Sequence, residues 1–158
     1  MKRLYPYYGA TTIVDYVDSF LFEGTYILIS EDGANVVNEQ GHPLIQYTHG
    51  KFWLNNHAHI VKGCNGFSEA LIYALMLTIN LQSIVTGAAQ PKINQANLRN
   101  FQTPLPEISE AQKLSELVSP LLEQMITNDQ ENMYLSQIRD NLLPQLMSGK
   151  LDVSNLEL

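Results

Sequence analysis

The fold is decided by the last third of the chain, residues 103–153, which read TPLPEISEAQKLSELVSPLLEQMITNDQENMYLSQIRDNLLPQLMSGKLDV. Its opening is too rich in proline to be helical. Ser109 and Gln112 then have the spacing of a capping box, which predicts that a helix begins there. Gly149 follows the last periodic apolar residues and marks the end of the helix. This stretch therefore predicts one long helix over residues 109–148.

Apolar residues recur along this helix at steps of three and four, which places them on one face. This apolar stripe consists of Leu114, Leu117, Leu121, Met125, Leu135, Ile138, Leu142 and Leu146. A continuous helix of this length would extend roughly 60 Å. A domain of about a hundred residues is only some 25–30 Å across and cannot cover such a stripe. The stripe therefore predicts pairing with another helix, of coiled-coil type.

Two prolines leave an alternative open. Pro120 is expected to kink or restart the helix, and Pro144 is expected to bend its last turn. Together with the polar stretch 127–132, Pro120 would allow the helix to fold back on its own domain. We favour a partner helix because the apolar stripe resumes after residue 132 with a similar period.

Composition and charge define the class of protein. The 158 residues are 45% hydrophobic and 16% charged, which is typical of one folded domain with an appendage. One cysteine leaves no internal disulfide, and neither a secretory signal nor a run long enough to span a bilayer is expected, so we predict a cytoplasmic protein without membrane association. Residues 1–104 carry six basic and seven acidic side chains, whereas residues 105–158 carry three and nine. A near-neutral domain is thus followed by an acidic helix.

The first sixty residues are mostly β-structure. Alternating or β-branched runs predict strands at residues 13–18, 25–30, 44–48 and 52–62. Ser68 is expected to cap a helix from Glu69 to about Leu81, and residues 95–100 are expected to form a helical turn. The predicted fold class is α+β, with a small mixed α/β domain over residues 1–104 and a long C-terminal helix within residues 105–158.

Catalytic and metal-binding patterns are weak. His57 and His59 share a face on a strand, as paired metal ligands of a β-barrel do, but no carboxylate follows over residues 60–67, so a role without metal is favoured. Glu31 and Asp32 are adjacent and would point apart on an extended chain, which favours a solvated turn over an acid–base pair. We therefore expect no catalytic activity and no metal or cofactor on this chain.

Amides, histidines and cations are concentrated in two polar loops, at residues 55–59 and 90–100. Asn and Gln can pair with the edge of adenine, and Lys or Arg can contact guanine or phosphate. Asn in loops more commonly caps turns, so both interpretations remain open.

Six segments carry a resemblance to a known family. They are residues 7–11 (YYGAT), 29–35 (ISEDGAN), 50–59 (GKFWLNNHAH), 86–94 (TGAAQPKIN), 104–106 (PLP) and 138–151 (IRDNLLPQLMSGKL). In this order they make the chain resemble the specificity subunit of type I restriction–modification systems, namely one target-recognition domain with its conserved helix. A complete specificity subunit carries two such domains and two helices. Some tens of residues also normally precede the first segment.

The resemblance implies a function and a set of partners. Recognition domains of this family read half of a bipartite site through the major groove of double-stranded DNA. Their conserved helices pack as an antiparallel pair and dock the modification (methyltransferase) subunit, with the restriction subunit as a further partner. S-adenosylmethionine, ATP and magnesium belong to those subunits. The chain would be a half-subunit that forms a homodimer or pairs with a second half, a split-gene fragment, or a remnant.

Our prediction is a DNA-recognition module that pairs or docks through the apolar stripe. The residues expected to contact DNA are Lys51, Asn55, Asn56, His57, Gln90, Lys92, Asn94 and Arg99. The first alternative is an assembly protein that does not bind DNA and acts only through its helix. The second is a metal-dependent β-barrel enzyme that uses His57 and His59.

Overall fold

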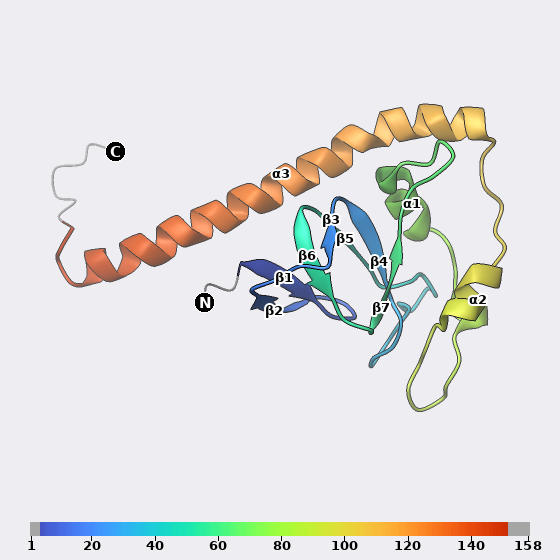
Figure 1. The fold of residues 1–158 in the computed structure, drawn as a ribbon, viewed down its shortest axis with the longest axis horizontal. Helices are drawn as coiled ribbons and strands as arrows, with labels where there is room; N and C mark the ends of the chain where they lie inside the picture. The colour runs from blue at the N-terminus through green and yellow to red at the C-terminus, as the bar shows by residue number, and fades with distance from the viewer. Residues whose placement is uncertain (1–3, 152–158) are drawn as a thin grey trace. The chain divides into compact units, whose positions relative to one another are not determined.

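The structure, a computed structural model, describes residues 4–151. It contains two compact units, one reaching to Pro120 and one starting at Leu121, which we call the head unit and the stalk unit. Two small sheets, short helices and the start of a long helix form the head unit, and the rest of that helix forms the stalk unit (Figure 1). The α+β class is confirmed.

The first sheet of the head unit has four strands in the order β2-β1-β6-β3. Their bounds are Ile13–Val17 for β2, Tyr5–Tyr8 for β1, Lys51–Leu54 for β6 and Phe22–Glu23 for β3. The β1 and β6 strands are parallel, and the other pairs are antiparallel. The predicted strand near residues 13–18 is confirmed. The turn after β1 is held in place by Gln46, whose Nε2 donates hydrogen bonds to the carbonyls of Gly9 and Ala10 at 3.3 and 3.2 Å.

The second sheet is antiparallel, with the order β5-β4-β7. These strands are β5 (Ile45–Thr48), β4 (Tyr26–Ser30) and β7 (Ala58–Val61). Helix α1 (Glu69–Met76) packs against β4 and β5, where the rings of Tyr47 and Tyr73 meet at 5.8 Å. The strands predicted at residues 25–30 and 44–48 are confirmed, whereas the run predicted as a strand over residues 52–62 is divided by a turn into β6 and β7, which belong to different sheets. The Ser68 cap is confirmed, because the Ser68 hydroxyl accepts a hydrogen bond from the Leu71 N–H at 3.2 Å.

Helix α1 ends five residues earlier than predicted, at Met76 instead of Leu81. The physical reason is a tertiary contact with the loop before β5. The Leu81 N–H donates to the carbonyl of Gly41 at 2.8 Å, and the Asn80 amide donates to the carbonyl of Gln40 at 2.7 Å. These bonds draw the chain out of the helix, so the apolar periodicity beyond Met76 overestimated its length.

The main core lies around Phe52, which is completely buried. Its ring lies 5.6 Å from that of Tyr8, 5.4 Å from that of Phe22 and 5.8 Å from that of Tyr26. A second cluster of Val36, Leu81 and Ile93 buries apolar side chains of the loops between β4 and α2 (Gln95–Asn100). This second cluster fixes the irregular segments that carry the polar residues discussed below.

Helix α3 runs from Ile108 to Met147 as one element of 40 residues. The predicted start at Ser109 is one residue late, since the Glu107 carbonyl already accepts hydrogen bonds from the N–H groups of Glu110 and Ala111. The helix is not restarted at Pro120, and it continues through residues 127–132, so the break in the helix that a fold-back there would need is absent. Gly149, with φ 68°, ends it as predicted, in a Schellman motif.

Within the head unit, α3 uses small residues to contact the domain. Ala111 and Ser115 are buried, and the Ser115 hydroxyl accepts from the Ser68 N–H at 3.0 Å and donates to the Gly66 carbonyl at 2.9 Å. Leu114 and Leu117 of the apolar stripe are instead 39% and 71% exposed. The first part of the stripe therefore does not pack on the head. No helix within residues 4–151 is both long and apolar enough to cross a membrane.

Candidate nucleic-acid interface

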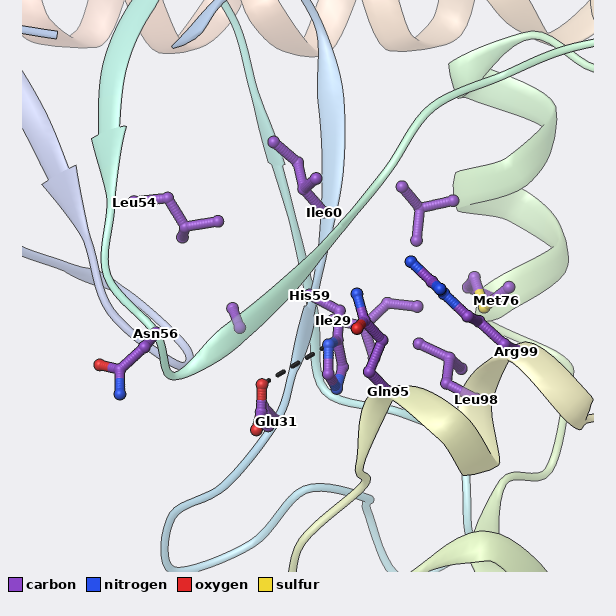
Figure 2. Close-up of a pocket in the computed structure, with 12 residues that line it drawn as sticks. Ile29, Glu31, Leu54, Asn56, His59, Ile60, Met76, Gln95, Leu98 and Arg99 are labelled. Atoms are coloured by element: carbon purple, nitrogen blue, oxygen red, sulfur yellow. Dashed lines mark ion pairs between the residues drawn. The ribbon is translucent and has the colours of Figure 1, made fainter. Parts of the chain in front are cut away.

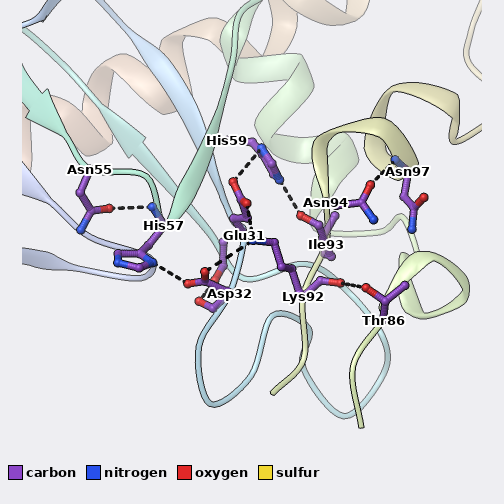
Figure 3. Close-up of polar contacts among 11 residues, drawn as sticks. Glu31, Asp32, Asn55, His57, His59, Thr86, Lys92, Ile93, Asn94 and Asn97 are labelled. Atoms are coloured by element: carbon purple, nitrogen blue, oxygen red, sulfur yellow. Dashed lines mark hydrogen bonds and ion pairs between the residues drawn. The ribbon is translucent and has the colours of Figure 1, made fainter. Parts of the chain in front are cut away.

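Glu31 and Asp32 join two polar segments that are far apart in the sequence (Figure 3). They directly follow β4, which ends at Ser30. The Glu31 N–H donates to the His57 carbonyl at 2.9 Å, and the Ile93 N–H donates to the Glu31 carbonyl at 2.8 Å. The turn between β6 and β7 and the segment before α2 are therefore fixed to the same short piece of backbone.

Their carboxylates strengthen this junction. Asp32 Oδ1 lies 2.7 Å from His57 Nδ1, and Glu31 Oε1 lies 2.9 Å from Lys92 Nζ. The two acidic side chains are only 22% and 19% exposed. The expected solvated turn is therefore wrong. Because Glu31 and Asp32 lie beyond the end of β4, strand alternation does not separate them, and both carboxylates come within 4.0 Å of Lys92 Nζ.

Lys92 and His59 complete the junction. The hydrogen bond to Glu31 raises the pKa of Lys92 above its usual value. His59 is buried on β7, with Nε2 2.6 Å from the Ile93 carbonyl oxygen and Nδ1 3.6 Å from Glu31. His57 is directed at Asp32 instead. Across residues 4–151, no group of three or more His, Cys, Asp or Glu side chains is arranged to hold a metal ion.

Three amides of the polar loops have structural roles. Asn55 Oδ1 accepts from the His57 N–H at 2.9 Å and closes the turn before β7. Asn94 Oδ1 accepts from the Asn97 N–H at 2.8 Å and caps α2, and the Asn97 amide donates to the Ile84 carbonyl at 3.3 Å. Turn capping, which the sequence left open for these amides, is thus what the structure shows for Asn55 and Asn94.

The other predicted DNA-contacting residues lie in different surroundings. Asn56, Gln90 and Arg99 are exposed to solvent. Lys51 begins β6 and lies 4.0 Å from Glu23, with its ammonium 4.7 Å from the centroid of the Phe20 ring. Since Asn55 follows the other end of the same strand, Lys51 is not brought together with the Asn55–His57 turn.

A pocket of about 700 Å³ lies between the β6–β7 region and helix α2 (Figure 2). Its polar lining residues are Glu31, Asn56, His59, Gln95 and Arg99. Asn56 and Arg99 are among the residues predicted to contact DNA, whereas Glu31 and Gln95 are not. The spacing of Gln95 and Arg99, one helical turn apart, is the signal that would have identified Gln95.

The family of the chain follows from comparison with known proteins. Residues 1–135 match the family described as the type I restriction modification DNA specificity domain. The chain is 33% identical over 116 residues to a Haemophilus influenzae protein named "Putative type I restriction enzyme specificity subunit", which covers 73% of this chain and 29% of that protein. The chain therefore belongs to the type I restriction–modification DNA specificity domain family, and the resemblance noted above is confirmed.

A second relative comes from Methanocaldococcus jannaschii. The specificity subunit of the type I restriction enzyme MjaIX of Methanocaldococcus jannaschii is 31% identical over 109 residues, which cover 67% of this chain and 25% of that protein. The chain thus spans less than a third of the length of each of these two curated relatives.

Proposed function

We propose that the head unit recognises a specific DNA sequence, as one half of the bipartite site of a type I restriction–modification system. The observation that carries this proposal is the junction at Glu31 and Asp32. The chain belongs to the DNA specificity domain family, and this junction holds together a segment of amides and histidines, residues 55–59, and a segment with amides and cations, residues 90–100. Such side chains are those that read base edges and contact phosphates.

The proposed role is recognition without catalysis. The chemistry of methyl transfer and cleavage, with S-adenosylmethionine, ATP and magnesium, would belong to the modification and restriction subunits. The target-recognition domain would comprise residues 1–104, and residues 105–158 would connect it to its partners.

The apolar stripe of α3 is the proposed docking surface for the modification subunit and for a second specificity half. Leu114 and Leu117 support this role because α3 contacts the head with Ala111 and Ser115 and leaves the stripe uncovered there. In the stalk unit the stripe continues with Leu121, Met125, Leu135, Ile138, Leu142 and Leu146. A homodimer formed through this stripe would recognise a palindromic, interrupted site.

DNA recognition is tested on the full chain assembled with its modification subunit. We expect selection from a pool of randomised duplexes to yield a defined sequence. Binding to that sequence should weaken steeply as the salt concentration rises, because phosphate contacts release counterions. A duplex of scrambled sequence is the matched control. Equal affinity for both duplexes would refute sequence recognition. A complex that binds no DNA would instead support the alternative function, an assembly protein that acts only through its helix.

A further inference from the structure

We propose that Asn56, Gln95 and Arg99 are the base-reading side chains, whereas Asn55, Lys92 and Asn94 hold the frame that positions them. This inference rests on the proposed function, because it assigns roles within the same recognition surface. Polar side chains that already have a partner within the folded head are assigned to the frame, and those without one are assigned to base reading.

The frame side chains are engaged inside the protein. An Asn that pairs with adenine uses its oxygen and its nitrogen together. Asn55 Oδ1 and Asn94 Oδ1 each already accept a backbone N–H, at 2.9 and 2.8 Å. Lys92 Nζ lies 2.9 Å from Glu31. Because these atoms already have partners, the three side chains have less hydrogen-bonding capacity left for a base edge than side chains without a partner.

The reading side chains are not engaged in this way. Asn56, Gln95 and Arg99 are exposed, and within residues 4–151 their side chains make no hydrogen bond or ion pair. All three nevertheless line one pocket, the one of about 700 Å³ beside α2. Three of the available polar side chains therefore line one pocket of the head, whereas Gln90, which is also exposed, does not line it.

The geometry suits base edges. Gln95 and Arg99 are four residues apart on α2, so their side chains lie on one face of the helix, about 5–6 Å apart at Cβ. Figure 2 shows both extending from α2 toward the pocket, whereas Asn56 lies on the turn at the other side with its amide pointing away from them. The surrounding apolar side chains of Leu54, Met76 and Leu98 lower the local dielectric, which strengthens hydrogen bonds formed there.

The chemistry of these side chains points to purines. The guanidinium fork of Arg99 matches the O6 and N7 acceptors of guanine, and the amides of Gln95 and Asn56 match N6 and N7 of adenine. Glu31 also lines the pocket, but its carboxylate is balanced by Lys92. We therefore expect guanine and adenine at the positions of the half-site that face α2.

The test compares base preference among variants of the full chain in complex with the modification subunit. Each variant is offered the pool of randomised duplexes and then the duplex selected by the wild type. Arg99→Gln should relax the preference for guanine at one position and weaken binding of the selected duplex by about 5- to 150-fold. Gln95→Ala and Asn56→Ala should do the same at adenine positions. Gln102→Ala removes an exposed amide outside the pocket and is the matched control.

The frame is tested by a conservative exchange. Asn94→Ser keeps an oxygen that can cap α2, so base preference should be retained. If Asn94 itself read a base, Asn94→Ser would instead abolish the preference for adenine at that position. The proposal is overturned if Asn94→Ser changes the selected sequence, or if the Arg99, Gln95 and Asn56 variants weaken binding equally on every sequence. A wild-type complex that selects no sequence would refute the recognition function itself.

Discussion

The head unit has a buried core of apolar side chains, whereas most large apolar side chains of the stalk unit are exposed. In the head, Phe52, Ile93 and Val36 are completely buried, and the polar rim is joined by bonds within the chain. In the stalk, Leu135 is 52% exposed and Met147 is 81% exposed. A side chain that already lies in a core contributes to folding, whereas an exposed apolar stripe contributes free energy only when a partner covers it.

Because of this difference, the head and the stalk can be followed by two separate measurements. The single tryptophan, Trp53, lies on β6 next to Phe52, so its fluorescence reports on the head alone. Helical circular dichroism is dominated by the 40 residues of α3. Changes in the head should therefore appear in the tryptophan signal, and changes in the stalk should appear in the solution mass.

The largest effect on the head is expected from Phe52→Ala. This change removes a fully buried ring that contacts three other aromatic rings, and it should lower the free energy of unfolding by about 3–5 kcal/mol. Urea unfolding followed by Trp53 fluorescence measures the loss. Leu143→Ala, at a half-exposed stalk position, is the control and should leave the tryptophan transition in place. A loss below about 1 kcal/mol for Phe52→Ala would contradict the aromatic core.

The largest effect on assembly is expected from Leu135→Asp. A charge placed in the apolar stripe would be buried without a partner on association, which should weaken pairing or docking by about 2 kcal/mol or more, roughly 30-fold. Sedimentation of the purified chain, alone and mixed with the modification subunit, measures this change.

The control for the stripe is Gln137→Asp. This residue lies two positions further along α3, about 200° around the helix from Leu135. It introduces the same charge on the opposite face and should leave the solution mass unchanged. Equal losses from both variants would show that association depends on the charge of the stalk and not on its apolar stripe.

The sequence predicted several of the regular elements, for physical reasons visible in particular residues, but it predicted neither β1 nor β3. In β4, Tyr26 and Leu28 face the Phe52 core while Ile27 and Ile29 are buried on the other face, so the run is apolar throughout and reads as a buried strand. The start of helix α3 was predicted within one residue from the spacing of Ser109 and Gln112, and its end was predicted from Gly149, because these signals are local. The predicted length of α1 was wrong because the hydrogen bond from the Leu81 N–H to the Gly41 carbonyl spans forty residues.

The candidate site was less predictable. Asn55, His57 and Lys92 attract attention by residue type, but sequence spacing does not show that they meet through Glu31 and Asp32. Adjacent acidic residues in a glycine-containing segment look like a solvated turn. Their function as a junction depends on two backbone bonds to segments 26 and 62 residues away, and no local pattern encodes those bonds.

A moderate effect is expected where α3 meets the head. Ser115→Ala leaves the Ser68 N–H and the Gly66 carbonyl without the hydroxyl that now bonds both, and it should cost about 1–3 kcal/mol. Urea unfolding followed by Trp53 fluorescence measures this change. Thr127→Ala removes an exposed helical hydroxyl and should stay within about 0.5 kcal/mol. Equal stabilities for the two variants would show that the Ser115 contact contributes nothing to the head.

The smallest effect is expected from Asp140→Asn. The hydrogen bond from Arg139 holds the pKa of the Asp140 carboxyl below its usual value. The stability from this pair is therefore present above the pKa of the unfolded carboxyl and is lost as pH falls through the folded pKa. Because both side chains are 65% exposed, solvent screens the pair, and thermal unfolding of Asp140→Asn should coincide with that of the wild type at pH 7.

The Asp140 variant also tests whether the docking surface of the stalk extends beyond the apolar stripe. It lies about 140° around the helix from Leu135, off the stripe, so its replacement should leave the solution mass unchanged as well. A variant that keeps its thermal unfolding but loses association would show that a partner contacts the Arg139–Asp140 pair. The docking surface of the stalk would then extend beyond the leucines, and the uncovered stripe alone would no longer account for it.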